Sequence, residues 1–408
     1  MHVIIIGAGA AGLAAACEAA GNGARVTVLE RHQRPGRKIL ASGNGRCNIM
    51  NTGRCYFNGR DLAHAVLDTV SQDDLRAFFQ RSGLNILREP EEDGRLYPSV
   101  MQSSAVLQSL LSRLRELKGR LMTDCPCEKI IPEADGFRVM TPRGELWADR
   151  VIIAAGSPAG GSLGHDAYDL LGGLGHHISE LLPSLCPIDC GGLPFSELKG
   201  LRFPAGLTLF RDRKAVEYAR GELLLTDTGI SGICAMQLSA SAASYPFDGK
   251  TFIDVDLSPL MDIVPRDHLH MTQRPFPVPD SQTAAALLTS RIAFLPRKRL
   301  LEGLIPAQLI PVLDDGQMDI PALAARLTNI RLTVTRTAAD RSQVIRGGAD
   351  PAGFNWDTLE SKRHRHLYAA GEILDVDGDC GGFNLMFAFA SGILAGRNAA
   401  NDCGWRSK

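Results

Sequence analysis

Three glycines near the start of the chain have the spacing of a turn that brings backbone close to a phosphate. Gly7, Gly9 and Gly12 form a GxGxxG pattern, and Glu30 follows at roughly the 20-residue offset of a dinucleotide fingerprint. The first glycine permits a tight turn, the second lets backbone approach a pyrophosphate, and the third lets a helix pack closely on a strand. Glu30 can accept hydrogen bonds from ribose hydroxyls, and its charge would repel a 2′-phosphate. The pattern predicts a dinucleotide site that favours an adenosine without that phosphate.

The segments around these glycines are those that such a site requires. Residues 3–6 are a β-branched run typical of a buried parallel strand. An Ala-rich helix is expected from Ala10 to Ala20, and a second strand from Arg25 to Leu29. The start of the helix, around Ala10 and Ala11, would present free N–H groups and a partial positive charge to the phosphates. The first 30 residues or so thus form a βαβ unit.

A second cluster of glycine and acid lies near the C-terminus. An apolar run over residues 367–370 ends at Gly371 and Glu372, and ligands of open α/β sheets bind at the carboxyl ends of strands. Flavoproteins of the two-dinucleotide fold use an acid there to hold a ribityl chain, which favours FAD over NAD. A third apolar strand, residues 151–155, ends at Ala155 and Gly156.

The last helix begins beside this second cluster. Gly381, Gly382, Phe383 and Asn384 open it, and its apolar body is expected from Leu385 to Asn398. A helix N-terminus at this place would stabilise the negative charge of a reduced flavin.

The rest of the chain divides into regions with different patterns of predicted helices and strands. Helices are expected over residues 61–87 and 103–117, and short antiparallel strands over 127–139 and 144–147. Residues 33–55 are rich in Gly, Arg and Asn, show neither helical nor strand periodicity, and are interpreted as a functional loop. From about residue 190 to 340 the pattern becomes part β and part helical, which indicates an inserted module.

Composition and charge limit the classes of protein to which the chain can belong. The chain has 408 residues, a formal charge of −1, 45% apolar and 22% charged residues, so it is a globular protein of two or three domains. Disorder, collagen and coiled coil are excluded. Near-neutral charge gives no case for nucleic acid as a partner, and the basic runs 297–299 and 362–366 are interpreted as solvated surface.

The ten cysteines are expected to be reduced, and no metal site is expected. The apolar run over residues 3–20 is interpreted as neither signal peptide nor membrane helix, and a cytoplasmic location is expected.

Longer motifs resemble one family over essentially the whole chain. GRKILASGNGRCN at 36–48, GELLLTDTGISG at 221–232, QVIRGG at 343–348 and GEILDVDG at 371–378 are similar to signatures of the BaiN/YhiN-type flavoproteins, which include aminoacetone oxidase and bile-acid reductases. The resemblance implies an α/β fold: a Rossmann-like FAD-binding domain of the two-dinucleotide-binding type (1–189 and 341–408), interrupted by an insert (190–340). It implies that the insert has a β-barrel-like part, about 190–258, and a helical part, about 259–330.

The resemblance also implies that the segments 36–48 and 371–385 lie along the FAD pyrophosphate, ribityl chain and ring. Consecutive glycines offer backbone N–H groups there, and cations offset phosphate charge. The candidate cofactor-binding residues in these segments, besides those named above, are Arg37, Lys38, Ser42, Gly43, Asn44, Gly45, Arg46, Cys47, Asn48, Asp377 and Leu385. The chain departs from the family pattern at Met50, Cys380, Met386, Phe387 and residues 154–168, several of them near the expected flavin ring.

These features predict an oxidoreductase in which FAD takes hydride from NAD(P)H or an organic donor and passes electrons to a small organic acceptor or to oxygen. No second GxGxxG is evident, so NAD(P)H would bind only transiently. No general acid is assigned: Cys47 and Cys380 are either redox-active or small packing residues, and His165 with Asp166 forms either a proton relay or a cap. Two alternatives stay open, a tRNA-modifying flavoprotein and a non-catalytic flavin-binding redox sensor. The number of subunits does not follow from the sequence.

Overall fold

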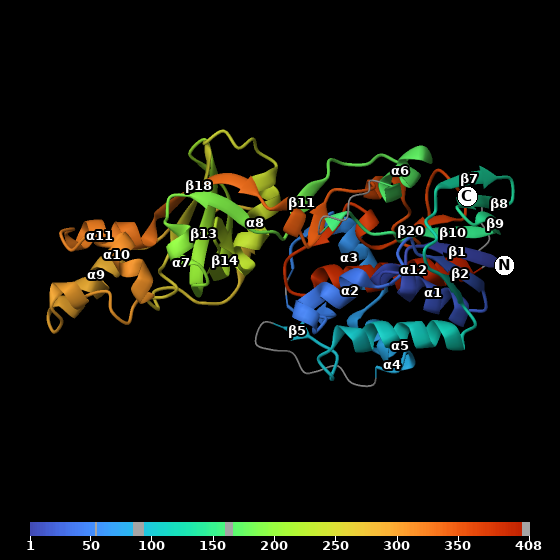
Figure 1. Ribbon diagram of the computed structural model, residues 1–408, viewed down its shortest axis with the longest axis horizontal. Coiled ribbons are helices and arrows are strands. Elements are labelled where there is room, and N and C mark those ends of the chain that lie inside the picture. The colour runs from blue at the N-terminus through green and yellow to red at the C-terminus, as the bar shows by residue number, and fades with distance from the viewer. Residues whose placement is uncertain (54, 85–93, 160–165, 402–408) are drawn as a thin grey trace. The chain divides into compact units, whose positions relative to one another are not determined.

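The computed structural model describes residues 1–53, 55–84, 94–159 and 166–401, without the side chain of Asp166. The chain forms two compact units (Figure 1). The first comprises Met1–Pro158, Ser162–Leu181 and Ile345–Lys408, and the second is centred on Leu182–Val344. The insert was predicted to span 190–340, whereas the contacts assign it the slightly longer Leu182–Val344.

The first unit is built on a five-stranded sheet in which every pairing is parallel. Its strand order is β20-β10-β1-β2-β6. The strands are β1 (His2–Ile6), β2 (Arg25–Leu29), β6 (Arg120–Met122), β10 (Arg150–Ile153) and β20 (Leu367–Ala369). The β-branched run of β1 is buried along its whole length because β1 lies between β2 and β10 and is covered on both faces. The predicted α/β fold with a parallel Rossmann-like sheet is confirmed.

Two helices from opposite ends of the chain lie side by side on this sheet (Figure 1). They are α1 (Ala10–Gly21) and α12 (Phe383–Ala400). A Cβ at Gly392 would lie 2.3 Å from the carbonyl oxygen of Ala11, and a Cβ at Gly396 would lie 2.5 Å from that of Ala15. Small residues on both helices therefore let the C-terminal helix pack directly on the backbone of the helix that follows the GxGxxG turn.

Two predictions about local structure were wrong in detail. The helix expected over 61–87 is two helices, α3 (Arg60–Thr69) and α4 (Gln72–Arg81), because Ser71 and Asp74 form a capping box that starts the second one. The segment 33–55 contains a short helix, α2 (Arg37–Ala41), followed by a 3-10 turn over Ser42–Gly45. A five-residue helix is too short to produce the periodicity by which a helix is recognised in a sequence.

The second unit contains a closed antiparallel barrel. Going round it, each strand pairs with the next in the order β13-β16-β18-β12-β15-β14, and β14 pairs again with β13. The strands are β12 (Ile188–Gly191), β13 (Arg202–Arg211), β14 (Lys214–Leu225), β15 (Gly229–Ser231), β16 (Thr251–Asp256) and β18 (Ile330–Thr337), with β17 (Leu269–Met271) added to β14. Closure removes the exposed strand edges. The expected β-barrel-like part is confirmed.

Helices complete the second unit. They are α7 (Phe195–Leu198), α8 (Ile233–Ala243), α9 (Ser281–Ile292), α10 (Ile310–Leu313) and α11 (Ile320–Thr328). The last three form the expected helical part. This unit has its own hydrophobic core, which includes Leu207, Leu223, Ile253 and Leu288.

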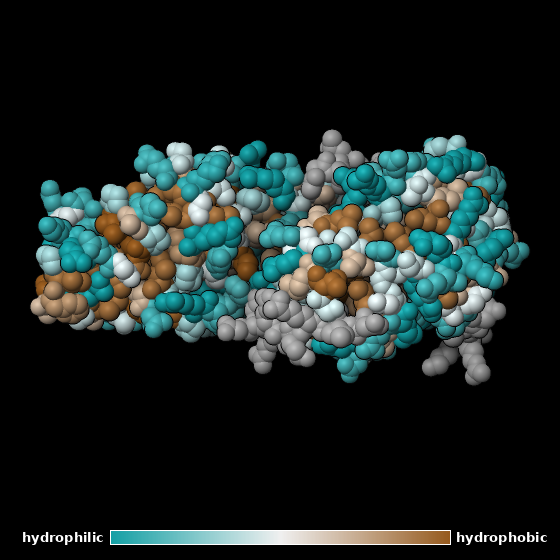
Figure 2. Space-filling view, turned by 60° about the horizontal axis from the view of Figure 1, so that its bottom comes forward, coloured by the Kyte–Doolittle hydropathy of each residue, from teal (hydrophilic) through white to brown (hydrophobic). Residues whose placement is uncertain are grey.

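The remaining elements of the described chain are α5 (Ser103–Glu116), α6 (Asp166–Gly173), β3 (Met50–Asn51), β4 (Phe57–Asn58), β5 (Arg95–Leu96), β7 (Lys129–Glu133), β8 (Gly136–Thr141), β9 (Gly144–Ala148), β11 (Leu182–Ser184), β19 (Val344–Arg346) and β21 (Asp377–Gly378). The face shown in Figure 2 mixes hydrophilic and hydrophobic side chains over both units. None of the helices in the described residues combines the length and apolar character needed to cross a membrane.

Candidate cofactor-binding site

The glycine turn after β1 has the geometry that its sequence predicts. The N–H of Gly7 donates to the carbonyl of Leu29 at 2.7 Å, which ties the turn to the end of β2. A Cβ at Gly12 would lie 1.9 Å from the carbonyl oxygen of Gly7, so no side chain fits there. A Cβ at Gly9 would meet nothing within 4 Å. Gly12 therefore serves packing, whereas Gly9 borders free space in front of the α1 N-terminus.

Glu30 is held at the end of β2 by backbone donors. Its Oε2 accepts from the N–H of Ala8 and its Oε1 from the N–H of His32, each at 2.9 Å, and the residue is 8% exposed. A carboxylate oxygen has a second lone pair, so both oxygens can still accept from a ribose hydroxyl. The carboxylate is thus fixed in place beside the glycine turn.

The second acidic residue, Glu372, is fixed by three different segments. Lys38 Nζ lies 2.6 Å from Glu372 Oε2 and donates to Ser157 Oγ at 2.7 Å. Ser157 Oγ in turn donates to Glu372 Oε1 at 2.6 Å, and the N–H of Ile345 donates to the same oxygen at 3.1 Å. This network joins the 36–48 segment, the residues after β10 and the second glycine-plus-acid cluster.

The two clusters meet at the first turn of α1. A Cβ at Gly371, whose φ is +77°, would lie 2.7 Å from the Cβ of Ala11. The N–H of Gly371 donates to Ser391 Oγ of α12 at 2.9 Å, and the N–H of Gly36 donates to the carbonyl of Ala8 at 2.9 Å. The structure therefore brings together the predicted residues from both ends of the chain.

The 42–48 segment has an unusual backbone. Asn44 and Cys47 have φ values of +53° and +59°, a region that costs energy for residues other than glycine and that clusters at functional sites. Ser42 Oγ donates to the carbonyl of Ile39, and the Arg46 guanidinium lies 5.0 Å from the ring centre of Tyr97. The exposed positions of this segment are Asn44, Gly45 and Arg46, and Arg37 and Lys38 just before it are also exposed.

Two consecutive residues of this segment are buried. Cys47 is fully buried, and burial raises the pKa of its thiol to about 11, so the sulfur is protonated at neutral pH. Asn48 is 8% exposed, and within the described chain its Oδ1 has no hydrogen-bond partner. A Cβ at Gly382 would lie 2.5 Å from that oxygen, so the glycine gives Asn48 the room it occupies beside the start of α12.

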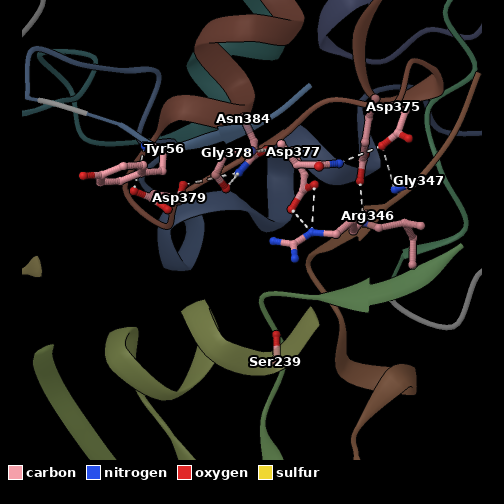
Figure 3. Close-up of polar contacts among 12 residues, drawn as sticks. Tyr56, Ser239, Arg346, Gly347, Asp375, Asp377, Gly378, Asp379 and Asn384 are labelled. Atoms are coloured by element: carbon pink, nitrogen blue, oxygen red, sulfur yellow. Dashed lines mark hydrogen bonds and ion pairs between the residues drawn. The ribbon is translucent and has the colours of Figure 1, made fainter. Parts of the chain in front are cut away.

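The loop that leads into α12 is held by its own polar groups (Figure 3). Asn384 Oδ1 accepts from the N–H of Gly378 at 2.8 Å, and its Nδ2 donates to the carbonyl of the same residue at 2.7 Å. Asp379 accepts from the N–H of Tyr56 at 3.1 Å, and Asp377 forms an ion pair with Arg346 at 3.3 Å. The side chains of Asn384 and Asp377 thus have protein partners that fix this loop.

The other candidate residues lie around the same region. Ala155 and Gly156 follow β10, and a Cβ at Gly156 would lie 3.9 Å from Lys38 Nζ. The carbonyl of Gly381 accepts from Asn51 Nδ2 at 2.8 Å. Ala10 begins α1, and Phe383 and Leu385 lie in the first turn of α12. Gly43 begins the left-handed stretch of the 42–48 segment. His165 and the side chain of Asp166 lie outside the described residues, as do Gly160 and Gly161.

Residues that sequence reasoning did not assign also belong here. Ser157 follows a predicted strand end directly, so the carboxyl-end rule could have found it. Ser391 carries no local signal, because its bond to Gly371 depends on how α12 packs. Arg346 was quoted only as part of a motif, and its ion pair with Asp377 spans 31 positions in sequence.

The residues present fit FAD. The α1 N-terminus has no side-chain cap, and free space borders Gly9, as two phosphates require. Arg37 and Arg46 supply positive charge, while the charge of Lys38 is offset by Glu372. Glu30 keeps acceptor capacity for a ribose, and the start of α12 directs a positive dipole to the same region. Among the described residues, no group of three or more His, Cys, Asp or Glu side chains is arranged to hold a metal ion.

Comparison with known proteins agrees with this geometry. The family model described as HI0933-like protein Rossmann domain matches residues 1–398. The chain belongs to this family. It is 35% identical over 422 residues to a 3-dehydro-bile acid delta(4,6)-reductase of Clostridium scindens, covering 97% of the chain and 98% of the relative.

More distant matches have other names. A ribosomal RNA dihydrouridine synthase of Escherichia coli is 26% identical over 404 residues, covering 95% of each chain. Among solved structures, a 3-ketosteroid-delta4-(5alpha)-dehydrogenase of Rhodococcus jostii matches with a TM-score of 0.46 and 13% identity, covering 98% of this chain and 96% of that one. The family model and the 35%-identical reductase show that this HI0933-like chain is an oxidoreductase of the flavoprotein type, and the resemblance stated from its motifs is confirmed.

Proposed function

We propose that this HI0933-like protein is a FAD-dependent reductase. It takes hydride from NAD(P)H or an organic donor and delivers electrons to a small organic acceptor, with oxygen as the alternative acceptor. One observation carries the proposal: Glu30, Lys38 and Glu372 are each fixed by hydrogen bonds around one turn of α1, although they come from distant parts of the chain. Such a constellation suits a long molecule with an adenosine at one end and a redox ring at the other.

The proposed roles of the residues follow from their partners. Glu30 binds the adenosine ribose, and the N-terminus of α1 beside Gly9 binds the pyrophosphate. Lys38 and Glu372 hold the ribityl region, while the α12 N-terminus at Gly382 stabilises negative charge at the ring. FAD supplies the chemistry when bound, since it stores two electrons between donor and acceptor. The chain contributes position and electrostatics.

We infer the acceptor from chemistry that two relatives share. By its name, the first reduces double bonds of a bile acid that carries an oxo group. The second, by its name, forms dihydrouridine, in which a ring carbon–carbon double bond beside a carbonyl has been reduced. The proposed reaction is therefore NAD(P)H plus a proton plus a double bond conjugated to a carbonyl, giving NAD(P)⁺ and the saturated carbonyl compound.

A spectrum of the purified protein is the decisive experiment. We expect the absorption bands of bound FAD, which NADH or NADPH bleaches without oxygen and which a conjugated enone restores. Colourless protein that takes up no added FAD would overturn the cofactor assignment. Bands that no nicotinamide cofactor bleaches would leave an organic donor as reductant or would favour the redox sensor.

The RNA-directed alternative rests on the 26%-identical relative, whose name shows that a protein of this length in the family acts on RNA. This alternative is tested with uridine-containing ribosomal and transfer RNA as acceptors. RNA turnover that falls steeply with salt, with no turnover of small enones, would replace the small-molecule substrate.

A further inference from the structure

Arg346 lies at the end of β19, and in the described residues only the Nε atom of its guanidinium donates to another protein group. Its Nε lies 3.3 Å from both carboxylate oxygens of Asp377, which is almost fully buried, whereas the Arg346 side chain is 27% exposed. Within the described residues, Nη1 and Nη2 donate to no protein atom. A guanidinium has five N–H donors in a fixed fork, so four of them are available to a ligand.

The backbone on both sides of Arg346 is fixed. The N–H of Gly347 donates to Asp375 Oδ1 at 3.1 Å (Figure 3). The N–H of Ile345 donates to Glu372 Oε1, also at 3.1 Å. A Cβ at Gly347, whose φ is +97°, would lie 2.0 Å from the carbonyl oxygen of Glu180. The guanidinium is therefore oriented before any ligand arrives, as a binding group should be.

The charge of this pair limits what it can bind. Asp377 neutralises the positive charge of Arg346, so the pair presents hydrogen-bond donors without net charge. A neutral oxygen acceptor suits such a pair better than a phosphate or a carboxylate, which would bring an uncompensated negative charge close to Asp377. The two outer nitrogens can donate to both lone pairs of one carbonyl oxygen.

We propose that Arg346 binds the carbonyl oxygen of the substrate, a neutral ketone or amide carbonyl conjugated to the double bond that is reduced. This rests on the proposed function, because the 371–385 segment that Arg346 contacts is the one assigned to the flavin. Donors fixed in advance on this oxygen are worth more as negative charge builds up on it during reduction. Asp377 acts as a positioning residue, since it holds Nε and so sets the direction of the outer nitrogens.

The test is probe binding to the FAD-loaded protein, followed through the spectrum of the flavin. The probes are a 3-oxo-4-ene steroid, cyclohex-2-enone and, for comparison, hex-2-enoate. Arg346→Gln should raise the Kd of the ketone probes about 10- to 100-fold, the loss expected for one or two buried hydrogen bonds. Arg346→Lys should restore only part of the lost affinity, because an ammonium group lacks the two outer nitrogens of a guanidinium. The exposed Arg365→Gln is the matched control and should change nothing.

A charge variant separates binding from a purely structural role. Asp377→Asn removes the carboxylate that offsets the charge of Arg346. It should therefore lower the affinity for the ketone probes and raise the affinity for hex-2-enoate, so that the carboxylate is preferred. Ketone affinity unchanged in Arg346→Gln, or loss of FAD affinity with no change in ketone affinity, would overturn the proposal. So would a wild-type protein that holds FAD and binds neither ketone. Failure to hold FAD at all would instead contradict the proposed function.

Discussion

Gly9 and Gly12 occupy the same turn but differ in what a side chain would meet there. For Gly12→Ala the new methyl would lie 1.9 Å from the carbonyl oxygen of Gly7, and relief of that overlap must move backbone. We expect it to lower the free energy of unfolding by at least the roughly 1–3 kcal/mol of an overpacked site. Gly9→Ala meets no atom within 4 Å and has a φ of −86° that alanine accepts, so stability should change by less than about 0.5 kcal/mol.

The same pair tests the proposed phosphate site. If the pyrophosphate lies against Gly9, the alanine methyl displaces it, and we expect Gly9→Ala to raise the Kd for FAD at least about tenfold. Urea unfolding and fluorescence titration with FAD measure the two quantities. A Gly9→Ala protein that binds FAD as tightly as wild type would place the phosphates elsewhere.

Cys47 gives a prediction about reactivity. The thiol is fully buried and burial raises its pKa to about 11, so little thiolate exists below pH 9. Iodoacetamide at pH 8 should leave Cys47 unmodified in the native protein and label it after unfolding, as measured by peptide mass spectrometry. Cys47→Ala should keep the flavin spectrum and turnover. Rapid labelling of native Cys47, or loss of turnover in the alanine variant, would revive the redox interpretation.

The residues of the site differ in how far a sequence can reveal them. Gly7 to Glu30 form a local pattern whose spacing follows directly from one βαβ unit. The contacts of Lys38 with Ser157 and Glu372 span 119 and 334 positions, so they depend on how strands β10 and β20 lie side by side. Neither composition nor periodicity encodes such a pairing, although the acid at each strand end could be recognised.

At the scale of elements, α12 ends on a buried cation. Arg150, at the start of β10 and 5% exposed, donates through Nη1 to the carbonyls of Asn398, Ala399 and Asn401 at 3.3, 3.0 and 2.6 Å. The carbonyl of Asn398 also accepts from the N–H of Asn401 at 3.3 Å. The last carbonyls of a helix lack the usual backbone donors, and a cation complements the negative end of the helix dipole.

Removal of this cation should therefore destabilise the first unit. We expect Arg150→Met to lower the free energy of unfolding by about 2–4 kcal/mol, because three carbonyls, of which that of Ala399 is buried, lose a charged donor. The exposed Arg120→Met, on the edge strand β6 of the same sheet, should stay within about 0.5 kcal/mol of wild type. Urea denaturation compares the two. Equal stability of both variants would show that water replaces the Arg150 contacts at little cost.

The buried side chain of His176 makes the stability of the first unit depend on pH. The ring is 5% exposed, stacks on Phe354 at 4.5 Å and contacts Ser361 Oγ at 2.9 Å. Burial, with smaller contributions from His364 and Arg363, lowers its pKa to about 4. Between pH 6.5 and 4 the unfolded chain binds a proton that the native ring does not.

The free energy of unfolding therefore falls as the pH drops through this window, by up to about 3 kcal/mol. His176→Gln should flatten this part of the stability curve measured by urea denaturation, while the exposed His64→Gln should follow the wild-type curve. Parallel curves for wild type and His176→Gln from pH 4 to 6.5 would show that His176 is protonated in the native state.

Most elements could be predicted where a long apolar or alternating pattern decides them, as for α1, α5 and α12. The break between α3 and α4 could have been read from Ser71 and Asp74, because a capping box is a local signal. Closure of the barrel could not, since it depends on β14 pairing with β13 on one side and with β15 and β17 on the other. Only the family resemblance supplied that expectation.

At the scale of the whole molecule, the two units have separate hydrophobic cores. The second unit is one continuous stretch, essentially Leu182–Val344, whose barrel closes on itself. In the first unit, the chain ends that border this stretch lie together: Ser179 N–H donates to the carbonyl of Gly348 at 2.8 Å, and Ile178 pairs with Ala349. The insertion therefore interrupts the first unit at two neighbouring points.

Because these points are adjacent, the first unit should fold without the second. We expect a chain in which residues 182–344 are replaced by about four glycine and serine residues, long enough to bridge the gap at about 3.5 Å per residue, to unfold cooperatively and bind FAD within about tenfold of wild type. The separate 182–344 fragment should fold as a β-rich domain and leave the FAD spectrum unchanged. Circular dichroism and FAD titration decide both outcomes. If the shortened chain folded but lost FAD, residues of the insert would have to join Glu30, Lys38 and Glu372 in holding the cofactor.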